Sequence, residues 1–592
     1  MAFDGLFLAA IREELGGLKN SKVDRIFQPE KETVVLHLRK GREMQKLLLS
    51  SLPHGPRVHL TRENFLHPST PPLFCQVLRK HLEGISLLEV EQPELERVLV
   101  FIFGGYDGLG QKTVKKLVVE IMGKHSNIIL LDSRDIIVDA ARRYTHEVSR
   151  HREVLPGKPY VPPPPQDKED PWLLTPEKWR ALFQEEKWRG EKWLVERLAG
   201  IGPQTAREIL FRGGLYPLSQ VTEKNIMASY EALQEILSSL YPHSWQPVVV
   251  WEGEKPLAFA AFDLKQFSGL KKEFFASPSQ ACEAFYRAQR LWQKKENLKA
   301  HLESLLLKEL QRCRKKEALH KETLEEGKRA EKYRLAGELI LAHLPQLAKG
   351  MASASLTDLY DPQGRKVDIE LDPSLSPAEN AQAYFRLYQK AKSAVAWAQK
   401  QLRAVEEEIS YLESVQQSLD MAQTLEDLEE IREELQQSGY LPPEDKAVGR
   451  KERRPTTSRP LEFISPDGFK ILVGRNNRQN ERLTFKIAAP EDLWLHVKGL
   501  PGSHVIIRSQ GKEVPPSTLE MAACLAAKYS KASLSSKAPV DYTQVKYVRK
   551  LPGGKPGMVL YEGHRTLYVD PTGTSASPPV YPGPQPLDQE QR

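Results

Sequence analysis

Two histidines flank a Gly-Leu-Pro-Gly turn in the stretch DLWLHVKGLPGSHVIIR, residues 492–508. Histidine is a common metal ligand and a frequent general base, so His496 and His504 are the first candidates for chemistry. A zinc site needs further ligands, and the nearby sequence offers only two acidic residues before the tryptophan. A nucleophile made of Ser503 and His504 is disfavoured too, because neighbours on a strand point to opposite faces. We therefore expect no metal, no cofactor and no catalytic residue here.

The same stretch and two others near it are rich in groups that bind RNA. Arg and Lys neutralise phosphates, Asn side chains and glycine amides bond to sugar or phosphate oxygens, and Trp stacks on unpaired bases. Taken singly, each residue also fits a solvated charge, and Trp494 fits a core position equally well. The predicted RNA- or ribosome-binding residues are Arg475, Asn476, Asn477, Asn480, Trp494, His496, Lys498, Gly502, Ser503, His504, Lys546, Arg549, Lys550 and Lys555.

A second polar turn lies between two apolar runs in EIMGKHSNIILLD, residues 120–132. Such a turn is suited to presenting backbone amides and a histidine to an anionic ligand. A plain hairpin turn would have a similar sequence. The candidate binding residues are Glu120, Ile121, Met122, Gly123, Lys124, His125, Ser126 and Asn127.

A turn with two glycines joins two helical patterns in LVERLAGIGPQTAREIL, residues 194–210. Glycine permits the tight turn, and amides at the start of the second helix suit a phosphate. This spacing is typical of a helix-hairpin-helix, which binds a nucleic-acid backbone without reading its bases. Gly200 and Gly202 are the candidate contacts. An ordinary corner between two helices is the alternative.

Residues 280–440 contain two heptad patterns separated by a segment rich in Pro, Gly and Asp. Each pattern has one apolar stripe, wide enough for a single partner helix. We therefore expect an antiparallel coiled-coil stalk rather than a helical bundle packed on the body. The stripes are Leu291, Leu298, Leu302, Leu305 and Leu310, and then Ala391, Val395, Ala398, Leu402, Val405, Ile409, Leu412 and Leu419.

The fold class expected is multidomain α+β, with one α/β domain at each end of the chain. Consecutive prolines in YVPPPPQDKEDPW, residues 160–172, predict a linker because proline removes backbone donors. The polar stretch 441–457 predicts another. The expected parts are an N-terminal domain at 1–160, the helix-hairpin-helix region with a small β segment at 173–270, the stalk at 280–440, an RNA-binding domain at 455–570 and a disordered tail at 571–592.

Bulk composition narrows the function classes. The 592 residues carry 85 Lys and Arg against 78 Asp and Glu, a net charge of +7, so a nucleic-acid surface must come from local clustering of charge. The four cysteines are far apart, which disfavours disulfides and Cys-based zinc sites and indicates a reducing compartment. No apolar run approaches the ~20 residues needed to cross a bilayer. We expect a cytoplasmic protein with no membrane partner and no small-molecule substrate.

Seven segments, in this order, resemble the NFACT-domain family. They are MAFDGLFLAAIREEL, STPPLFCQVLRKHLEG, VEIMGKHSNIILLD, LDPSLSPAENAQAYFRLYQKAK, GRNNRQNERLTFK, DLWLHVKGLPGSHVIIR and APVDYTQVKYVRKLPGGKPGMVLY. The resemblance covers residues 1–570 and identifies the ends as NFACT N-terminal and RNA-binding domains. It implies a non-enzymatic ribosome-associated quality-control factor that binds large (50S) ribosomal subunits carrying stalled peptidyl-tRNA and contacts ribosomal RNA. Such factors recruit alanyl-tRNA and promote mRNA-independent alanine tailing of the nascent chain.

The resemblance also implies a tRNA-engaging Asp-Arg pair in the N-terminal domain. The matching positions in QPELERVLVF are Glu96 and Arg97, so the arginine agrees and the acid is one methylene longer. With residues 120–127 they form the predicted tRNA-binding set. The longer acid makes the tRNA preference less secure than the binding itself.

Three other functions compete with this interpretation. A helix-hairpin-helix DNA glycosylase would need an N-terminal proline nucleophile and a four-cysteine finger, but positions 2 and 3 are Ala2 and Phe3. A fibronectin-binding surface adhesin would need an export route, and the sequence indicates none. A purely structural coiled-coil tether would leave the basic ends unexplained.

Overall fold

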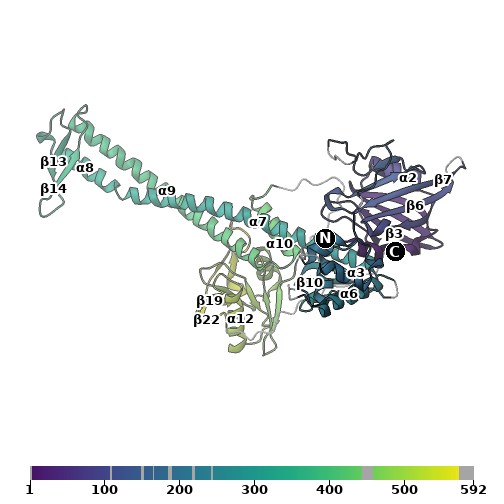
Figure 1. Ribbon diagram of the computed structural model, residues 1–592. Helices are drawn as coiled ribbons and strands as arrows, with labels where there is room; N and C mark the ends of the chain where they lie inside the picture. The colour runs from purple at the N-terminus through teal and green to yellow at the C-terminus, as the bar shows by residue number, and fades with distance from the viewer. Residues whose placement is uncertain are drawn as a thin grey trace. The chain divides into compact units, whose positions relative to one another are not determined.

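The computed structural model describes residues 3–106, 110–147, 152–164, 166–184, 190–216, 221–241, 244–442 and 458–572 (Figure 1). Most of the predicted 441–457 linker and nearly all of the predicted tail lie outside the described residues. The chain divides into two compact units, Met1–Gln293 and Lys294–Arg592. They are called the first and second unit below, and each is described by itself.

An antiparallel sheet forms the centre of the first unit. Within the described residues it has nine strands in the order β4-β3-β2-β1-β5-β6-β7-β8-β9. Each neighbouring pair in this order is antiparallel, and short turns rather than crossover helices join most of them, which corrects the expectation of an α/β domain. The strands are β1 (Lys22–Glu30), β2 (Thr33–Lys40), β3 (Glu43–Ser50), β4 (Arg57–Thr61), β5 (Ser86–Glu91), β6 (Val98–Tyr106), β7 (Lys112–Glu120), β8 (Asn127–Leu131) and β9 (Ile137–Ala140).

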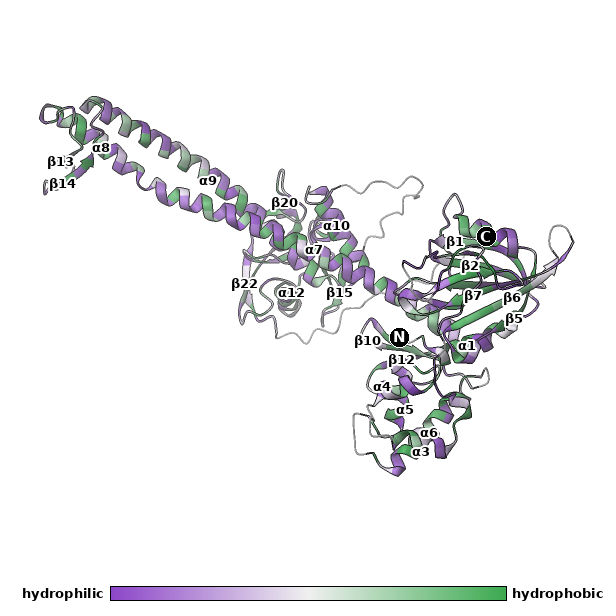
Figure 2. Ribbon diagram, turned by 45° about the horizontal axis from the view of Figure 1, so that its top comes forward, coloured by the Kyte–Doolittle hydropathy of each residue, from purple (hydrophilic) through white to green (hydrophobic). Residues whose placement is uncertain are grey.

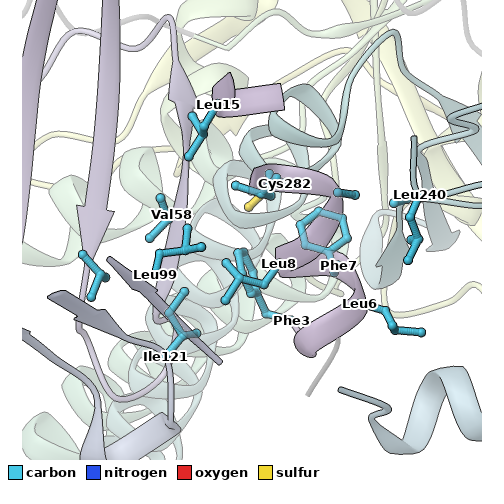
Figure 3. Packing of buried hydrophobic residues seen from close by; sticks show 14 of the residues in the cluster. Phe3, Leu6, Phe7, Leu8, Leu15, Val58, Leu99, Ile121, Leu240 and Cys282 are labelled. Atoms are coloured by element: carbon cyan, nitrogen blue, oxygen red, sulfur yellow. The ribbon is translucent and has the colours of Figure 1, made fainter. Parts of the chain in front are cut away.

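Helix α1 (Gly5–Leu15) is apolar on almost every side and is the centre of the first unit's core. Figure 3 shows its Leu8 on the side of Val58 and Leu99, which belong to the sheet. On another side, the ring of Phe7 meets the ring of Phe259 edge-on at 4.8 Å. The core is therefore continuous through both parts predicted for residues 1–270. Helix α2 (Leu73–Leu82) packs against β1.

Among the described residues, four helices and a small sheet complete the first unit. The helices are α3 (Pro176–Phe183), α4 (Glu191–Arg197), α5 (Pro203–Arg212) and α6 (Glu223–Ser238). The small sheet, in the order β11-β10-β12, consists of β10 (Val248–Glu252), β11 (Lys255–Ala260) and β12 (Lys271–Phe274). The short three-residue helices described in the unit are η1 (Gly16–Leu18), η2 (Pro93–Leu95), η3 (Gly123–His125), η4 (Pro171–Leu173) and η5 (Lys265–Phe267).

Two long helices lie side by side in antiparallel directions in the second unit, in both views (Figures 1 and 2). They are α7 (Pro278–Gly327), which begins in the first unit, and α9 (Pro377–Met421). Leu302 and Leu310 of α7 belong to the same buried cluster as Val405 and Leu412 of α9. At 1.5 Å per residue, α9 alone is about 68 Å long. Figure 2 shows mainly hydrophilic residues along both helices, and mainly hydrophobic ones along strands such as β2 and β6.

Smaller elements stand at the two ends of this helical pair. At the far end, α8 (Ala330–Ala342) and η6 (Leu344–Gln346) precede a hairpin of β13 (Ser353–Thr357) and β14 (Lys366–Glu370). After α9, helix α10 (Leu425–Gln437) packs back against it.

The C-terminal domain is again an antiparallel sheet rather than an α/β sheet. Within the described residues it has six strands in the order β15-β16-β18-β17-β19-β22, and α12 (Pro516–Lys528) packs its alanines on one face. The remaining elements are β15 (Leu461–Ile464), β16 (Lys470–Val473), α11 (Asn477–Arg482), the π-helix η7 (Leu483–Ile487), β17 (Leu493–Val497), β18 (Val505–Ile507), β19 (Ala538–Gln544), η8 (Val545–Tyr547), β20 (Val548–Lys550), β21 (Val559–Tyr561) and β22 (Arg565–Val569).

Candidate nucleic-acid interface

Strand pairing brings the two predicted tRNA-binding segments together in the first unit. Val98 of β6 lies opposite Glu120 of β7, and one step further the amide of Ile121 donates to the carbonyl of Arg97 at 2.8 Å. Glu96 and Arg97 therefore lie at the same end of this strand pair as the 120–127 turn. This proximity was not visible in the sequence, because the pairing of β6 with β7 brings together residues more than twenty positions apart.

The backbone just before Glu96 adopts an unusual conformation. Glu94 and Leu95 both have left-handed φ angles, +42° and +57°, a region that non-glycine residues rarely occupy. Leu95 is held there by Gly200, where a Cβ would lie only 2.9 Å from the Cβ of Leu95. Gly200 itself has a φ of +71°. Strained backbone held by tight packing is frequent at functional sites, and here it directly precedes Glu96 and Arg97 in the chain.

Leu95, Glu96, Arg97 and Gly200 line a pocket of about 290 Å³. It lies between the η2 turn, residues 3–5 and the α4–α5 turn. Glu96 accepts a hydrogen bond from Nε2 of Gln166 at 3.3 Å. Lys168 is half-buried beside it, and burial lowers the pKa of its ammonium while Glu96 acts in the opposite direction. The pocket is thus lined by two acids, Glu96 and the buried Asp4, and by two cationic residues, Arg97 and Lys168, around a cleft of nearly nucleotide size.

Asp4 occupies the position where a phosphate would meet the α4–α5 turn. Its Oδ2 accepts from the amide of Gly202 at 3.0 Å and from the hydroxyl of Thr205 at 2.6 Å, and its Oδ1 accepts from the amide of Phe7 at 2.9 Å. One carboxylate therefore caps both α1 and α5. Burial raises the pKa of Asp4, against the lowering effect of these three donors. The amide of Gly202 is therefore already bonded within the protein and Gly200 lies against Leu95, so nucleic-acid contacts at these two glycines stay a prediction.

Replacing Asp4 with alanine is expected to destabilise the first unit by on the order of 3 kcal/mol, since it removes two caps and leaves buried donors unpaired. Denaturant unfolding of the full chain measures this. Thr175→Ala is the matched control, because Thr175 caps the single helix α3. It should cost about 1 kcal/mol. Equal losses in the two variants would contradict the double-cap role.

Most of the 120–127 segment builds the turn rather than its surface. Glu120 is fully buried and accepts from Arg152 at 2.7 Å and from the hydroxyl of Tyr160 at 2.9 Å. The hydroxyl of Ser126 donates to the carbonyl of Gly123 at 2.7 Å. The backbone positions of Ile121, Gly123 and Asn127 are likewise buried, and Met122 is half-buried. The exposed side chains of this set are Lys124 and His125.

In the second unit, the GRNNRQN segment holds the C-terminal domain onto the helices that precede it. Arg475 pairs with Asp427 at 2.9 Å, with side chains only 11% and 2% exposed. The amide of Asn476 donates to Glu430, and that of Asn477 donates to Glu434 at 3.0 Å. Asn480 instead accepts from the backbone amide of His504 at 3.0 Å. All four side chains are thus engaged in internal bonds, and that they contact RNA stays a prediction.

Lys555 also lies where the C-terminal domain packs against the helices that precede it. We call this contact the joint. The ammonium of Lys555 lies 4.2 Å from the ring centre of Tyr411 and 4.4 Å from that of Tyr440. Such cation–π contacts are favourable when the cation is partly desolvated, and burial lowers the pKa of Lys555. Lys555 is therefore a structural residue of this joint rather than a phosphate ligand.

Trp494, His496 and His504 form an aromatic cluster inside the C-terminal domain. Trp494 is fully buried, stacks on His496 at 5.7 Å and meets His504 edge-on at 5.3 Å. Burial lowers the pKa of both imidazoles, so both are neutral near pH 7. Nδ1 of His504 is 2.8 Å from the hydroxyl of Thr484. Trp494 and His504 are thus core residues, which settles the alternative left open for Trp494.

Of the other predicted residues in that turn, Gly502 and Ser503 are packed against the rest of the domain and Lys498 lies on its surface. Gly502 forms a bridge with Ser530, whose Cβ would lie 2.7 Å from an added Cβ. Ser503 is buried. Lys498 is exposed at the end of β17, 3.9 Å from the buried carboxylate of Asp541. Within the described residues, no group of three or more His, Cys, Asp or Glu side chains is arranged to hold a metal.

Exposed cations gather on η8, β20 and the neighbouring α11–η7 segment. Lys546, Arg549 and Lys550 are exposed, with Lys546 over the ring of Tyr547 at 5.0 Å. Lys550 pairs with Glu481 at 2.8 Å. A groove of about 670 Å³ beside Lys550 is also lined by Arg478, Arg482 and Lys486. Arg482 and Lys486 were not among the predicted residues, although cations spaced four residues apart from Arg478 onward are visible in GRNNRQNERLTFK.

The buried carboxyl of Glu434 makes the joint sensitive to pH. Burial raises its pKa from 4.5 to about 7, while Asn477 and Tyr411 act in the opposite direction. Because the folded-state pKa is the higher one, the folded state binds the extra proton, and stability falls as pH rises from about 4.5 to about 7. The free energy of unfolding of the wild-type protein should therefore fall by on the order of 2–3 kcal/mol between pH 5 and pH 8, and Glu434→Gln should remove this fall.

Calorimetric melting of the full chain at both pH values tests this prediction. The matched control is Glu433→Gln, which removes a half-exposed partner of Arg478 on the same helix. The control should keep the wild-type difference between the two pH values. A Glu434→Gln protein with the same difference would show that this carboxyl is not the source.

Comparison with known proteins agrees with these domains. The family model of NFACT N-terminal and middle domains matches residues 4–454, and that of the NFACT protein RNA binding domain matches residues 459–567. The chain therefore belongs to the NFACT family. Among the described residues, no helix combines the length and apolar character needed to cross a bilayer.

Individual relatives narrow the class further. The chain is 37% identical to the Rqc2 homolog RqcH of Bacillus subtilis (strain 168), covering 96% of this chain and 98% of that one. It is 34% identical to RqcH of Streptococcus suis (strain 05ZYH33), covering 97% and 98%. The solved fibrinogen binding protein from Staphylococcus aureus is 28% identical, covers 48% of this chain and 99% of that chain, and has a TM-score of 0.42. This protein is a ribosome quality control factor with an RNA-binding domain.

Proposed function

We propose that this protein binds the large (50S) ribosomal subunit that carries a stalled peptidyl-tRNA, and recruits alanyl-tRNA to it in the cytoplasm. The recruited tRNA supplies alanine for mRNA-independent extension of the nascent chain, and the tail marks that chain for degradation. Peptide-bond formation belongs to ribosomal RNA in this scheme. The protein positions RNA and is not itself an enzyme.

The observation that carries the proposal is the pocket formed by Glu96, Arg97 and Lys168. Its two cationic side chains suit a phosphate or ribose oxygen, and its volume of about 290 Å³ suits one nucleotide rather than a duplex. Lys124 and His125 are exposed on the adjoining turn and extend the donor surface. A bound tRNA thus meets several donors that strand pairing holds at one end of the sheet.

The second contact in the proposal is with ribosomal RNA through Lys546, Arg549 and Lys550. These side chains are exposed, whereas the other candidates in this domain are largely committed to internal bonds. Lysine and arginine on an irregular surface neutralise phosphates without reading sequence. Subunit binding and tRNA binding then use different residues and are separable by mutation.

Mass spectrometry of stalled nascent chains tests the proposed activity. Cells that express the protein should yield chains with C-terminal alanine extensions, and cells that lack it should yield chains without them. The substitution Glu96→Asp, which introduces the residue typical of the family, should preserve the extensions. Extensions that persist without the protein would contradict the proposal.

A further inference from the structure

A second pocket in the first unit holds an arginine with an unusual environment. The pocket has a volume of about 300 Å³ and lies between the end of β1, the loop before β4 and the first turns of α7. Its walls are mainly apolar and include Pro29, Leu52, Phe65 and the ring of Tyr286. Arg57, the first residue of β4, also lines it. We call it the Arg57 pocket.

Arg57 is a buried cation without a carboxylate partner among the described residues. It is 5% exposed, and its Nη1 donates to the carbonyl of Gly55 at 2.8 Å. Its guanidinium carbon lies 4.8 Å from the ring centre of Tyr286. Its Nε–H is buried and has no hydrogen-bond partner. An unpaired buried charge and an unused donor are both costly, so an anionic group that entered the pocket would gain from pairing with Arg57.

Two neighbours agree with a positive potential in this region. Arg290 also lines the pocket, although its guanidinium is paired with Glu63 at 2.7 Å. His59 is buried, and its pKa is lowered to about 3 by burial first and by Arg57 second. Glu30 is the one acid among the described residues that line the pocket, so the environment that favours an anion is confined to the surroundings of Arg57.

We propose that the Arg57 pocket binds a small carboxylate with an apolar body. The carboxylate accepts the Nε–H of Arg57, and the apolar part lies among Leu52, Phe65 and Tyr286. Arginine matches carboxylate geometry through parallel N–H donors, and a guanidinium in low dielectric binds it strongly. Apolar walls exclude a fully hydrated anion such as inorganic phosphate. The proposal does not depend on the tRNA function, because it concerns none of the residues around Glu96.

Titration calorimetry of the full-length protein tests the proposal with three probes. 3-Phenylpropionate should bind at one site, 3-phenylpropanamide should bind at least about tenfold more weakly because it lacks the charge, and inorganic phosphate should not bind. The carboxylate could belong to a free acid or to a peptide C-terminus. A tripeptide ending in phenylalanine distinguishes these sources, since tighter binding than 3-phenylpropionate assigns the site to a C-terminus and weaker binding assigns it to a free acid.

Arg57→Met keeps most of the side-chain volume and removes the charge. It should abolish binding of 3-phenylpropionate and leave the melting temperature unchanged or higher, because no internal ion pair is lost. The control is Arg62→Met, an exposed arginine that does not line the pocket and should leave binding unchanged.

Two results would overturn the proposal. One is equal binding of the acid and the amide, or no binding of either, by the wild-type protein. The other is undiminished acid binding by Arg57→Met. If that variant does not fold, Arg57 has a structural role and the comparison of acid with amide on the wild-type protein decides the matter alone.

Discussion

Replacing Glu96 and Arg97 together with alanine is expected to abolish the recovery of tRNA with the protein. Both residues line the pocket beside Lys168, and they directly follow the strained turn at Glu94 and Leu95. Losing two directed polar groups should weaken binding by at least about tenfold to a hundredfold. Sedimentation with large subunits should not change, because the exposed cations of the C-terminal domain are intact. Northern blotting of the co-purified RNA measures the effect.

The matched control is alanine replacement of Arg42 and Glu43. This neighbouring acid–base pair is exposed on the β2–β3 hairpin and does not line the pocket. Its tRNA recovery should equal that of the wild-type protein. Undiminished tRNA recovery by the Glu96 and Arg97 variant would contradict a role for this pocket in tRNA binding.

Reversing the charges of Lys546, Arg549 and Lys550 to glutamate is expected to weaken association with large subunits strongly. The slope of log K against log salt is negative, and each lost phosphate contact reduces its magnitude by about 0.7–0.9, so the loss of three contacts reduces it by about two to three. Sucrose-gradient sedimentation at several salt concentrations measures both the affinity and the slope.

Reversal of Lys512, Lys528 and Lys537 is the control for this prediction. These lysines are exposed on the same domain and change the net charge equally. Their loss should change subunit association much less. Equal weakening by the two triple variants would mean that net charge rather than a defined surface drives binding.

Local patterns predicted the main elements well. Alternating or continuous apolar residues in TVVLHLRK and NIILLD correspond to β2 and β8, and the heptad stripe through Leu302 and Leu412 corresponds to the buried seam of α7 and α9. These patterns are readable because the period of the chain determines which side chains share a face. The antiparallel strand order could not be predicted from these patterns, since it depends on which strands pair with each other across long stretches of sequence.

The candidate site was predicted less well, for a chemical reason. Arg475, Asn476 and Asn477 offer the donors that bind phosphate, but the same donors bind carboxylates, and here the carboxylates of Asp427, Glu430 and Glu434 receive them. Residue type alone cannot separate these two partners. Burial separates them, and burial depends on the packing of α10 against the C-terminal domain.

Long-range capping was also invisible to sequence patterns. The amide of Gly202 and the carboxylate of Asp4 are 198 positions apart, so no local motif links them. The glycines at 200 and 202 were correctly taken as a turn between two helices. Their partner, however, is an internal acid, and that fact came only from the fold.

The most direct test of the account is to sequence the RNA that co-purifies at low salt from cells with stalled ribosomes. The account predicts large-subunit ribosomal RNA together with transfer RNA enriched in alanine acceptors, and predicts that the Glu96 and Arg97 variant keeps the first and loses the second. Recovery of neither class of RNA with the wild-type protein would contradict it.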